Sequence, residues 1–526
     1  MTVAADAAPT AAPWQEVELT LTAGSRHRDP YGAVDVWADF THESGAVLRR
    51  PAFYDGPGDG GHTWRVRFAS PLPSGTWRWR SGASVADAGL ADREGSLEVR
   101  APAVAPPGRF ERHGFWRMAP DGLTLQHADG TPALLVGDTA WGLPWRATPE
   151  QVRTYAADRS AKGFNAVLLM SVQPDTGAEG PEDRTADEGF GRGFRDLPEG
   201  TLTDLDVGYF QHLDVLVDVL VEHGVVPVWQ PVFQGFGWKG LGAAGTVVPT
   251  EQYARYCRYL VARYGARPAL WLVGADGSGH EPQIAAGGAE VHAWDCYEQP
   301  TGVHYRPHAT NDAHQDADWL DFQWCQTGHS GEHFPERVAD MARNTPLKGV
   351  ANGEPSYENT GRTGRAAGWW QGHEAWANLC AGGTMGVVYG AGSLWQWKLH
   401  PDEPGHSDFF SAPGAGWREA LDFEGSTYVG LVGRILDGLP LTGARPDWTR
   451  TLHPRGLLVP GVLFLTYLAE GGDLRVLDGA DVPRAYRVLD PRTGEVVAEG
   501  VREHDDSPVP DPGGAPRVYV CTRPAA

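Results

Sequence analysis

Cysteine is scarce in this sequence. The 526 residues contain five cysteines, at positions 257, 296, 325, 380 and 521, and no CxxC pair. An odd number of widely spaced cysteines argues against a disulfide framework and against a cysteine-based metal site, so we expect free thiols in a reducing compartment. The N-terminus, MTVAADAAPTAAPW, has neither the basic nor the apolar stretch of a signal peptide. The expected location is therefore cytoplasmic.

Positive charge and long apolar runs are also lacking. The chain carries 67 acidic and 44 basic residues, which gives a formal net charge of −23, and it has no basic block. This balance argues against nucleic acid and anionic membranes as partners. No run of about 18 apolar residues is present, so no membrane-spanning helix is expected. A neutral ligand such as a carbohydrate is compatible with this charge, and the oligomeric state stays open.

Glycine, proline and tryptophan are abundant, at 68, 41 and 21 residues. The length suits a large core with two smaller domains. Residues 1–13 are expected to be disordered. Residues 14–100 alternate apolar and polar side chains between Gly/Pro-rich turns, which predicts an Ig-like β-sandwich. The Pro/Ala-rich stretch 101–108 predicts a stiff linker, and the short strands within 440–526 predict a second, smaller β-sandwich.

Residues 109–439 alternate apolar strands with helical segments. A helix is expected to begin at Thr148-Pro149-Glu150, because threonine is a good N-cap and proline suits the first helical position. Eight segments are strand candidates: PALLVGD (132–138), FNAVLLM (164–170), VVPVWQP (225–231), ALWLVG (269–274), TGVHYRP (301–307), WLDFQW (319–324), KGVAN (348–352) and TMGVVYG (384–390). The predicted fold class is α/β, a (β/α)8 barrel flanked by the two β-sandwiches.

Two carboxylates come directly after predicted barrel strands. Asp276 follows the strand 269–273, and Glu354 follows the short strand 348–351. Barrel enzymes collect their chemistry at the carboxyl ends of the strands, and pairs of carboxylates cleave glycosidic bonds. The pair therefore favours a glycoside-cleaving hydrolase. The alternative, that each acid caps a helix or pairs with an arginine, stays open at this point.

The remaining strand ends supply amides, aromatic rings and further polar groups, which are the side chains that sugar recognition needs. The candidate substrate-binding residues are Asp138, Trp141, Gln173, Gln230, Tyr305, His308, Gln326, His329, Asn352, Tyr357, Tyr389, Trp395 and Trp397. Structural roles compete with binding for each: Asp138 could cap the next turn, the indoles could belong to the core, and the histidines could be buried with satisfied hydrogen bonds.

Other chemistries fit poorly. There is no HExxH motif and no His/Asp pair at the tight spacing of metal ligands, so neither a metal ion nor another cofactor is expected. The GxSxG elbow of a serine hydrolase is missing as well.

Several motifs resemble one known family. VGDTAWGL, KGFNAVLLM, WLVGADG, QTGH, NGEPSYE and YGAGSLWQW resemble the barrel of the apiosidase-type glycoside hydrolases. The stretch from FYDGPGDGG to WRWR is similar to their N-terminal Ig-like sandwich, and YLAEGGDLRVLDG is similar to their small C-terminal β-domain, which carries a collagen-binding label. By position, the family's catalytic pair falls on Asp276 and Glu354. The resemblance implies that Asp276 is the general acid/base and Glu354 the nucleophile.

One departure from the family concerns the fifth strand, where HYRPH places Arg306 at a position that usually holds histidine, so the sugar preference there is in doubt. The long loop after the second strand and the flanking sandwich are expected to close one end of a pocket. We therefore expect an exo-acting retaining enzyme that releases a terminal sugar, either apiose or another furanose or pyranose. Two alternatives stay open: a carbohydrate-binding protein with an inactive barrel, and a lyase or transglycosylase on the same barrel.

Overall fold

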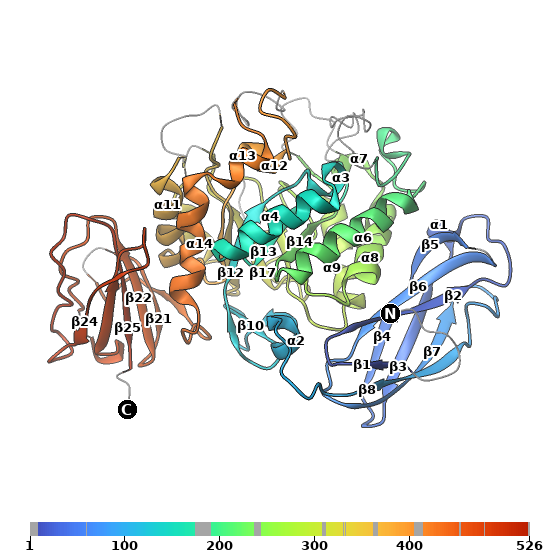
Figure 1. Cartoon of the computed structure of the whole chain (residues 1–526), viewed down its shortest axis with the longest axis horizontal. Coiled ribbons are helices and arrows are strands. Elements are labelled where there is room, and N and C mark those ends of the chain that lie inside the picture. Colours follow the sequence, from blue (N-terminus) through green and yellow to red (C-terminus); the bar gives the residue numbers. More distant parts are fainter. Residues whose placement is uncertain are drawn as a thin grey trace.

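The computed structural model describes residues 9–523, with the exception of 59, 174–190, 236–243, 308–311, 330, 332, 361–366, 404–413, 452, 453 and 478. Three units lie next to one another along the long axis of the molecule: a pair of β-sheets, a central barrel wrapped by helices, and a C-terminal sheet (Figure 1). This arrangement confirms the predicted fold class. Among the described residues, no helix is both long and apolar enough to cross a membrane.

The N-terminal unit is made of two antiparallel-rich sheets, ordered β1-β8-β7-β3-β4 and β2-β6-β5. Aromatic residues fill the space between them, and the rings of Phe40 and Phe68 stack with centroids 4.0 Å apart. Thr10 and Ala11 form β1 and pair with β8, which corrects the expectation that residues 1–13 are disordered. Residues 1–8 lie outside the described part of the chain. The elements are β1 (Thr10–Ala11), β2 (Glu16–Thr22), α1 (Pro30–Ala33), β3 (Val36–His42), β4 (Val47–Pro51), β5 (Phe53–Gly58), β6 (Gly61–Ala69), β7 (Gly75–Ala83) and β8 (Glu94–Val99).

The central unit is a closed parallel barrel whose eight strands come from the eight predicted segments. Its strands are β12 (Leu135–Thr139), β13 (Ala166–Met170), β14 (Val226–Gln230), β15 (Leu270–Leu272), β16 (Thr301–His304), β17 (Phe322–Gln326), β18 (Gly349–Glu354) and β19 (Gly386–Val388). The amino end is covered by α2 (Arg109–His113) and a small sheet of β9 (Trp116–Met118), β10 (Leu125–His127) and β11 (Pro132–Ala133).

Helices surround the barrel and bury its strands on the outer side (Figure 1). They are α3 (Leu143–Arg146), α4 (Pro149–Lys162), the 3-10 turn η1 (Leu197–Glu199), α6 (Val207–Glu222), α7 (Ala244–Val247), α8 (Thr250–Tyr264), α9 (Pro282–Trp294), α10 (Glu336–Met341), α11 (Trp369–Cys380), α12 (Gly392–Trp395), α13 (Trp417–Leu421) and α14 (Glu424–Leu436). The helix predicted at Thr148 is α4. Thr148 and Gln151 form a reciprocal capping box, and Gly163 ends the helix at φ 104°.

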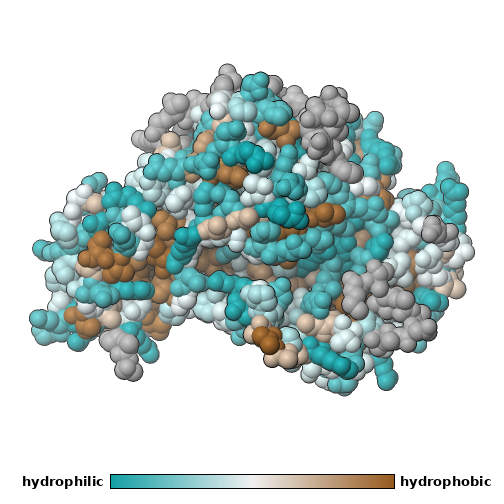
Figure 2. All heavy atoms as spheres, in the orientation of Figure 1, coloured by the Kyte–Doolittle hydropathy of each residue, from teal (hydrophilic) through white to brown (hydrophobic). Residues whose placement is uncertain are grey.

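The C-terminal unit is a six-stranded antiparallel sheet in the order β20-β21-β22-β25-β23-β24. One face packs against α11 through β22, and Leu463, Leu465 and Val518 belong to the same core cluster as the barrel. Apolar residues also gather on the visible surface of this unit (Figure 2). Its elements are β20 (Arg445–Asp447), β21 (Gly456–Val459), β22 (Leu463–Leu468), η2 (Gly479–Asp481), β23 (Ala485–Leu489), β24 (Val496–Val501) and β25 (Arg517–Thr522).

Polar contacts join the N-terminal unit to the barrel. Asp214 on α6 receives Arg67 from β6 at 2.6 Å and Arg263 from α8 at 2.7 Å, and Arg263 also reaches Asp55 at 3.1 Å. The pKa of Asp214 is lowered because the two guanidinium groups outweigh the effect of burial. Removing one partner from such a buried network leaves an uncompensated charge, so the N-terminal unit is fixed on the barrel at this surface.

Candidate active site

Asp276 lies just past β15 in an unusual backbone conformation. Its φ of 57° is in the left-handed region, which residues other than glycine seldom adopt. The flanking residues are held in place, because Ala275 forms a bridge to Phe233 and Gly277 forms one to Tyr305. Gln234 fastens this turn further by accepting the Ala275 N–H at 2.9 Å. The neighbouring strands thus stabilise a strained residue, which is a pattern found at functional sites.

Glu354 is the last residue of β18 and follows a bulge. The pairing with β17 shifts there, so that Asn352 faces Cys325 while Glu354 faces Gln326. Gly353 is the extra residue, and a Cβ at this position would lie 1.7 Å from the Trp324 ring. Only glycine therefore allows the buried indole to pack here. The bulge sets the direction of the Glu354 side chain.

The two carboxyl groups meet at a histidine. His304, the last residue of β16, places its Nε2 3.0 Å from Glu354 Oε2 and 3.4 Å from Asp276 Oδ1. One side-chain atom from each of Asp276, His304 and Glu354 lies within 4.8 Å of the other two. On the other side, His329 Nε2 lies 3.1 Å from Glu354 Oε1. The two carboxyl groups are therefore closer than about 9.5 Å, the largest separation found between the paired acids of glycosidases.

The surroundings give the two acids opposite protonation tendencies. Burial raises the pKa of Asp276 to about 7, and the charge of Glu354 adds to this effect. Burial would also raise the pKa of Glu354, but its contacts with the rings of His304 and His329 outweigh this and lower the pKa. One carboxyl group is thus suited to hold a proton near neutral pH and the other to stay ionised, the division of labour that paired acids in glycosidases need.

Several predicted binding residues lie around the pair. Gln230 accepts from His304 Nδ1 at 2.8 Å, and the side chain of Gln326 hydrogen-bonds to Asp276. The Trp141 ring lies 6.4 Å from that of His304 and 5.8 Å from that of Trp395. The Tyr357 ring lies 4.6 Å from that of His329. These side chains form an aromatic and amide-lined wall beside the carboxylates, and their contacts with substrate stay predictions.

Four other candidates have partners within the protein, and the expectation that they bind substrate stays a prediction. Asp138 is fully buried against α4, where it receives Arg159 at 2.6 Å and the Tyr155 hydroxyl at 3.0 Å. The reason is strand geometry, since successive side chains face opposite sides of a sheet. The other three have structural partners: Tyr389 donates to Glu358 at 2.5 Å, Trp397 stacks on Trp417 with ring centroids 4.9 Å apart, and Tyr305 donates to the Ala313 carbonyl at 2.6 Å.

For the remaining candidates, a role in substrate binding stays a prediction. Gln173 donates to the Gly191 carbonyl at 3.3 Å, and Asn352 accepts from the Thr327 hydroxyl at 3.4 Å. Both are buried, and their roles stay predictions. His308 lies outside the described residues, as do residues 174–190 of the loop that was expected to close the pocket.

His304 is the central residue that the sequence analysis missed. It stands at the very end of its strand in TGVHYRP, whereas the candidates that the sequence indicates, Tyr305 and His308, come after it. Period-two alternation places His304 on the opposite side of the strand from Tyr305. The position at a strand end therefore marks His304 as a possible site residue. Whether its side chain faces the barrel interior depends on the register between the strands, which the sequence does not reveal.

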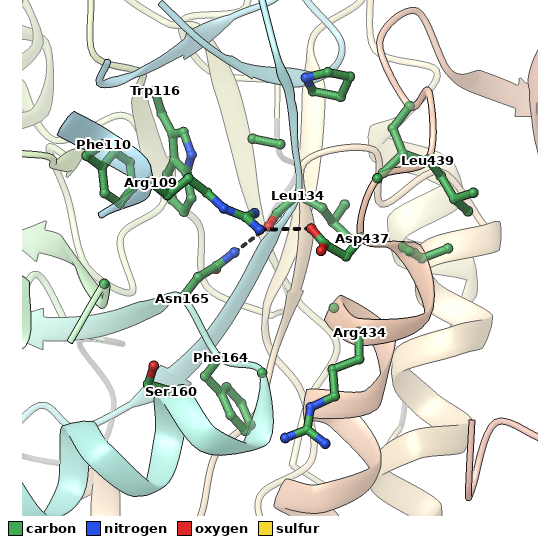
Figure 3. A pocket seen from close by; sticks show the side chains of 18 of the residues that line it. Arg109, Phe110, Trp116, Leu134, Ser160, Phe164, Asn165, Arg434, Asp437 and Leu439 are labelled. Atoms are coloured by element: carbon green, nitrogen blue, oxygen red, sulfur yellow. Dashed lines mark hydrogen bonds and ion pairs between the residues drawn. The ribbon is translucent and has the colours of Figure 1, made fainter. Parts of the chain in front are cut away.

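A cavity of about 440 Å³ lies at the opposite end of the barrel. It is lined by residues that precede strands, including Leu134 and Asn165, and by the end of α14 (Figure 3). An ion pair between Arg109 and Asp437, 2.9 Å long, borders it. The cavity contains neither carboxylate of the pair, and barrel chemistry is found at the carboxyl ends of strands, so its size does not make it the active site.

Comparison with known proteins decides the family. The model for the apiosidase-like catalytic domain matches residues 119–443, which is more than half of the chain. The chain belongs to the apiosidase-like family. The prediction that this apiosidase-like protein is a glycoside hydrolase is confirmed at that level. A second model, a domain of unknown function (DUF5060), matches residues 10–84. No curated protein matches.

Solved structures share the fold of this apiosidase-like protein. A glycoside hydrolase family 5 protein from Bacteroides vulgatus is 19% identical, with a TM-score of 0.66 over 78% of this chain and 94% of its own. A second Bacteroides vulgatus protein, described as a glycoside hydrolase, is 17% identical, with a TM-score of 0.69 over 98% of this chain and 100% of its own. At these identities the likeness establishes the fold alone.

Proposed function

We propose that the protein is an exo-acting, retaining glycoside hydrolase that releases a terminal neutral sugar, apiose or another furanose or pyranose. The observation that carries this proposal is that Asp276 and Glu354 meet at the carboxyl end of the barrel. One carboxylate oxygen of each lies no more than 4.8 Å from the other. Retaining enzymes hold their two carboxyl groups about 5–5.5 Å apart, whereas inverting enzymes leave about 6.5–9.5 Å for a water molecule. The short separation favours retention.

The roles follow from the protonation tendencies of the pair. Asp276, whose pKa is raised to about 7, donates a proton to the leaving oxygen. Glu354, whose pKa is lowered, attacks the anomeric carbon as the carboxylate and forms a glycosyl-enzyme ester. Asp276, now ionised, takes a proton from water, and that water cleaves the ester. Both steps use the same two groups, and the anomeric configuration is inverted twice.

Burial supports action at a chain end. Asp276 and Glu354 are each 4% exposed, so a sugar must enter an enclosed space to reach them. A long polymer bound across the barrel would need an open groove instead. Trp141, Trp395 and Tyr357 supply aromatic faces for the C–H surface of one sugar ring.

A substrate screen tests the proposal. Aryl β-apiosides, furanosides and pyranosides are incubated with the wild-type chain, and an oligosaccharide carrying the best sugar is followed over time. We expect release of the terminal residue alone. Early internal fragments of mixed length would contradict exo action. Sugar binding without turnover would support the carbohydrate-binding alternative, and an unsaturated or transferred product would indicate a lyase or a transglycosylase.

A further inference from the structure

Three atoms of the kind that bind metal ions converge between the two acids. They are Asp276 Oδ1, His304 Nε2 and Glu354 Oε2, and they come from the ends of three different strands. All three residues are buried, with exposed fractions of 4%, 0% and 4%. The residues are 28 or more positions apart in the sequence, so motif spacing gave no sign of a metal site.

These atoms share a further property. Among the described residues, none of the three makes a well-aligned hydrogen bond, although His304 Nε2 and Glu354 Oε2 form an ion pair 3.0 Å long. Nε2 of His304 is close to both oxygens, but its orientation does not make a hydrogen bond to either. Buried polar atoms in native proteins nearly always find partners, and leaving one without a partner costs about 1–3 kcal/mol. Three such atoms facing one space leave room for a polar or charged group between them.

His304 is prepared for a metal ion by its other nitrogen. Nδ1 lies 2.8 Å from Gln230 Oε1, an acceptor, so Nδ1 carries the proton. Nε2 holds a proton in the imidazolium that contacts Glu354 and a lone pair in the neutral ring, so a metal ion binds there in competition with that proton. Metal-binding histidines are commonly oriented in this way, with the distal N–H donated to an oxygen that fixes the tautomer.

The distances suit a small divalent ion. Zinc binds nitrogen and oxygen at about 2.0–2.2 Å in tetrahedral geometry, which places two ligands about 3.4 Å apart. The Nε2 atom of His304 lies 3.4 Å from one oxygen and 3.0 Å from the other. The two carboxylate oxygens lie within 4.8 Å of each other, and both bind one tetrahedral ion when they approach to about 3.4 Å.

We infer that Asp276, His304 and Glu354 form a binding site for Zn²⁺, with the ion between the acid and the nucleophile. Imidazole together with carboxylates suits zinc, whereas Mg²⁺ prefers six oxygen ligands and keeps several waters. The ion takes the place of the proton on Asp276 and balances the charge of two acids whose ion-pair partners in the described part of the chain are His304 and His329. A sugar cannot reach the pair while the ion is bound, so zinc inhibits the proposed reaction competitively.

Titration calorimetry on the full chain, in a buffer that does not bind metals, tests the site directly. Wild type is expected to bind one Zn²⁺ with a defined affinity, and His304→Gln is expected to lose that site. The chain has 19 histidines, so a matched control is needed. His113, which lies 2.7 Å from Asp129 on the surface, supplies it: His113→Gln should bind zinc as wild type does.

Two further measurements keep the inference open to refutation if His304→Gln fails to fold. Co²⁺ bound to wild type is expected to give the intense visible absorption of a four-coordinate site, and Mg²⁺ is expected to give no saturable binding. Equal zinc binding by wild type and His304→Gln would overturn the inference, as would a weak octahedral cobalt spectrum. Substrate is absent from these experiments, so their outcome does not depend on whether a particular glycoside is hydrolysed.

Discussion

The ends of β15 and β18 each carry a carboxylate at the same depth but in different surroundings. Asp276 and Glu354 are both 4% exposed, so burial alone would raise the pKa of both. Among the described residues, His304 and His329 contact Glu354 at 3.0 and 3.1 Å, whereas Asp276 has His304 at 3.4 Å and feels His329 through its charge. The neighbouring histidines, rather than burial, therefore account for the opposite pKa shifts of the two acids, on which their proposed roles rest.

Removing the ionised member of the pair should have the largest effect. Glu354→Gln keeps the size of the side chain but removes the nucleophile, so kcat should fall by ~10⁴-fold or more on every substrate. Hydrolysis of an aryl glycoside measures this loss. Glu336→Gln, at an exposed position on α10, is a control that should keep full activity. Substantial turnover by Glu354→Gln would show that another group attacks the sugar.

Removing the protonated member should have an effect that depends on the substrate. Asp276→Asn cannot protonate the leaving oxygen, so substrates with poor leaving groups should lose about 10²–10⁴-fold in kcat/KM. Activated aryl glycosides should lose far less in the same parameter, because their leaving groups need no proton. Steady-state kinetics on a matched pair of substrates gives the comparison. Equal losses on both would contradict the assignment of Asp276 as the acid.

Asp138, a third carboxylate at a strand end, allows a structural acid to be compared with the two acids of the pair. Asp138 neutralises Arg159 in a buried ion pair 2.6 Å long, with both side chains 0% exposed. Asp138→Asn removes the charge and should lower the free energy of unfolding by about 3 kcal/mol. Asp276→Asn should not lower stability, because it relieves charge repulsion from Glu354. Thermal melts of the two variants measure the difference, and a similar loss for both would indicate that Asp276 is structural as well.

The pH profile should show the smallest effect, spread over several units. Asp276 acts in its protonated form, so kcat/KM should fall about tenfold per unit as the pH rises above its pKa of about 7. The acidic limb should lie at low pH, since the pKa of Glu354 is lowered. In Glu354→Gln the repulsive charge is gone, so a ¹³C NMR titration should find a lower pKa for Asp276. An unchanged value would show that the two groups do not interact.

Much of this architecture could be predicted from the sequence, because it depends on local patterns. Eight apolar runs separated by helices gave the barrel strands, and Thr148-Pro149 gave the start of α4. The direction of side chains at strand ends does not follow from such local patterns. Asp138 and Asp276 look alike in sequence, but one faces α4 and the other faces Glu354.

The direction of a strand-end side chain depends on contacts between strands that no single segment reveals. Gly353 shows this. It is the extra residue of the bulge before Glu354, and its lack of a side chain leaves space for Trp324 on the neighbouring strand. His304 was missed for a similar reason, since its role depends on Gln230, 74 residues away. The turn that holds Asp276 is likewise tied at Ala275 to Gln234, which lies past the end of the neighbouring strand β14. Such register-dependent contacts limit site prediction more than strand prediction.

The stereochemistry of the first product tests the central claim most directly. Proton NMR during the first minutes of hydrolysis distinguishes the anomers of the released sugar before they equilibrate. With a nucleophile and an acid/base as close as Asp276 and Glu354, the first product should have the same anomeric configuration as the substrate. A first product of opposite configuration would mean that water attacks the sugar directly, and it would contradict the assignment of Glu354 as the nucleophile.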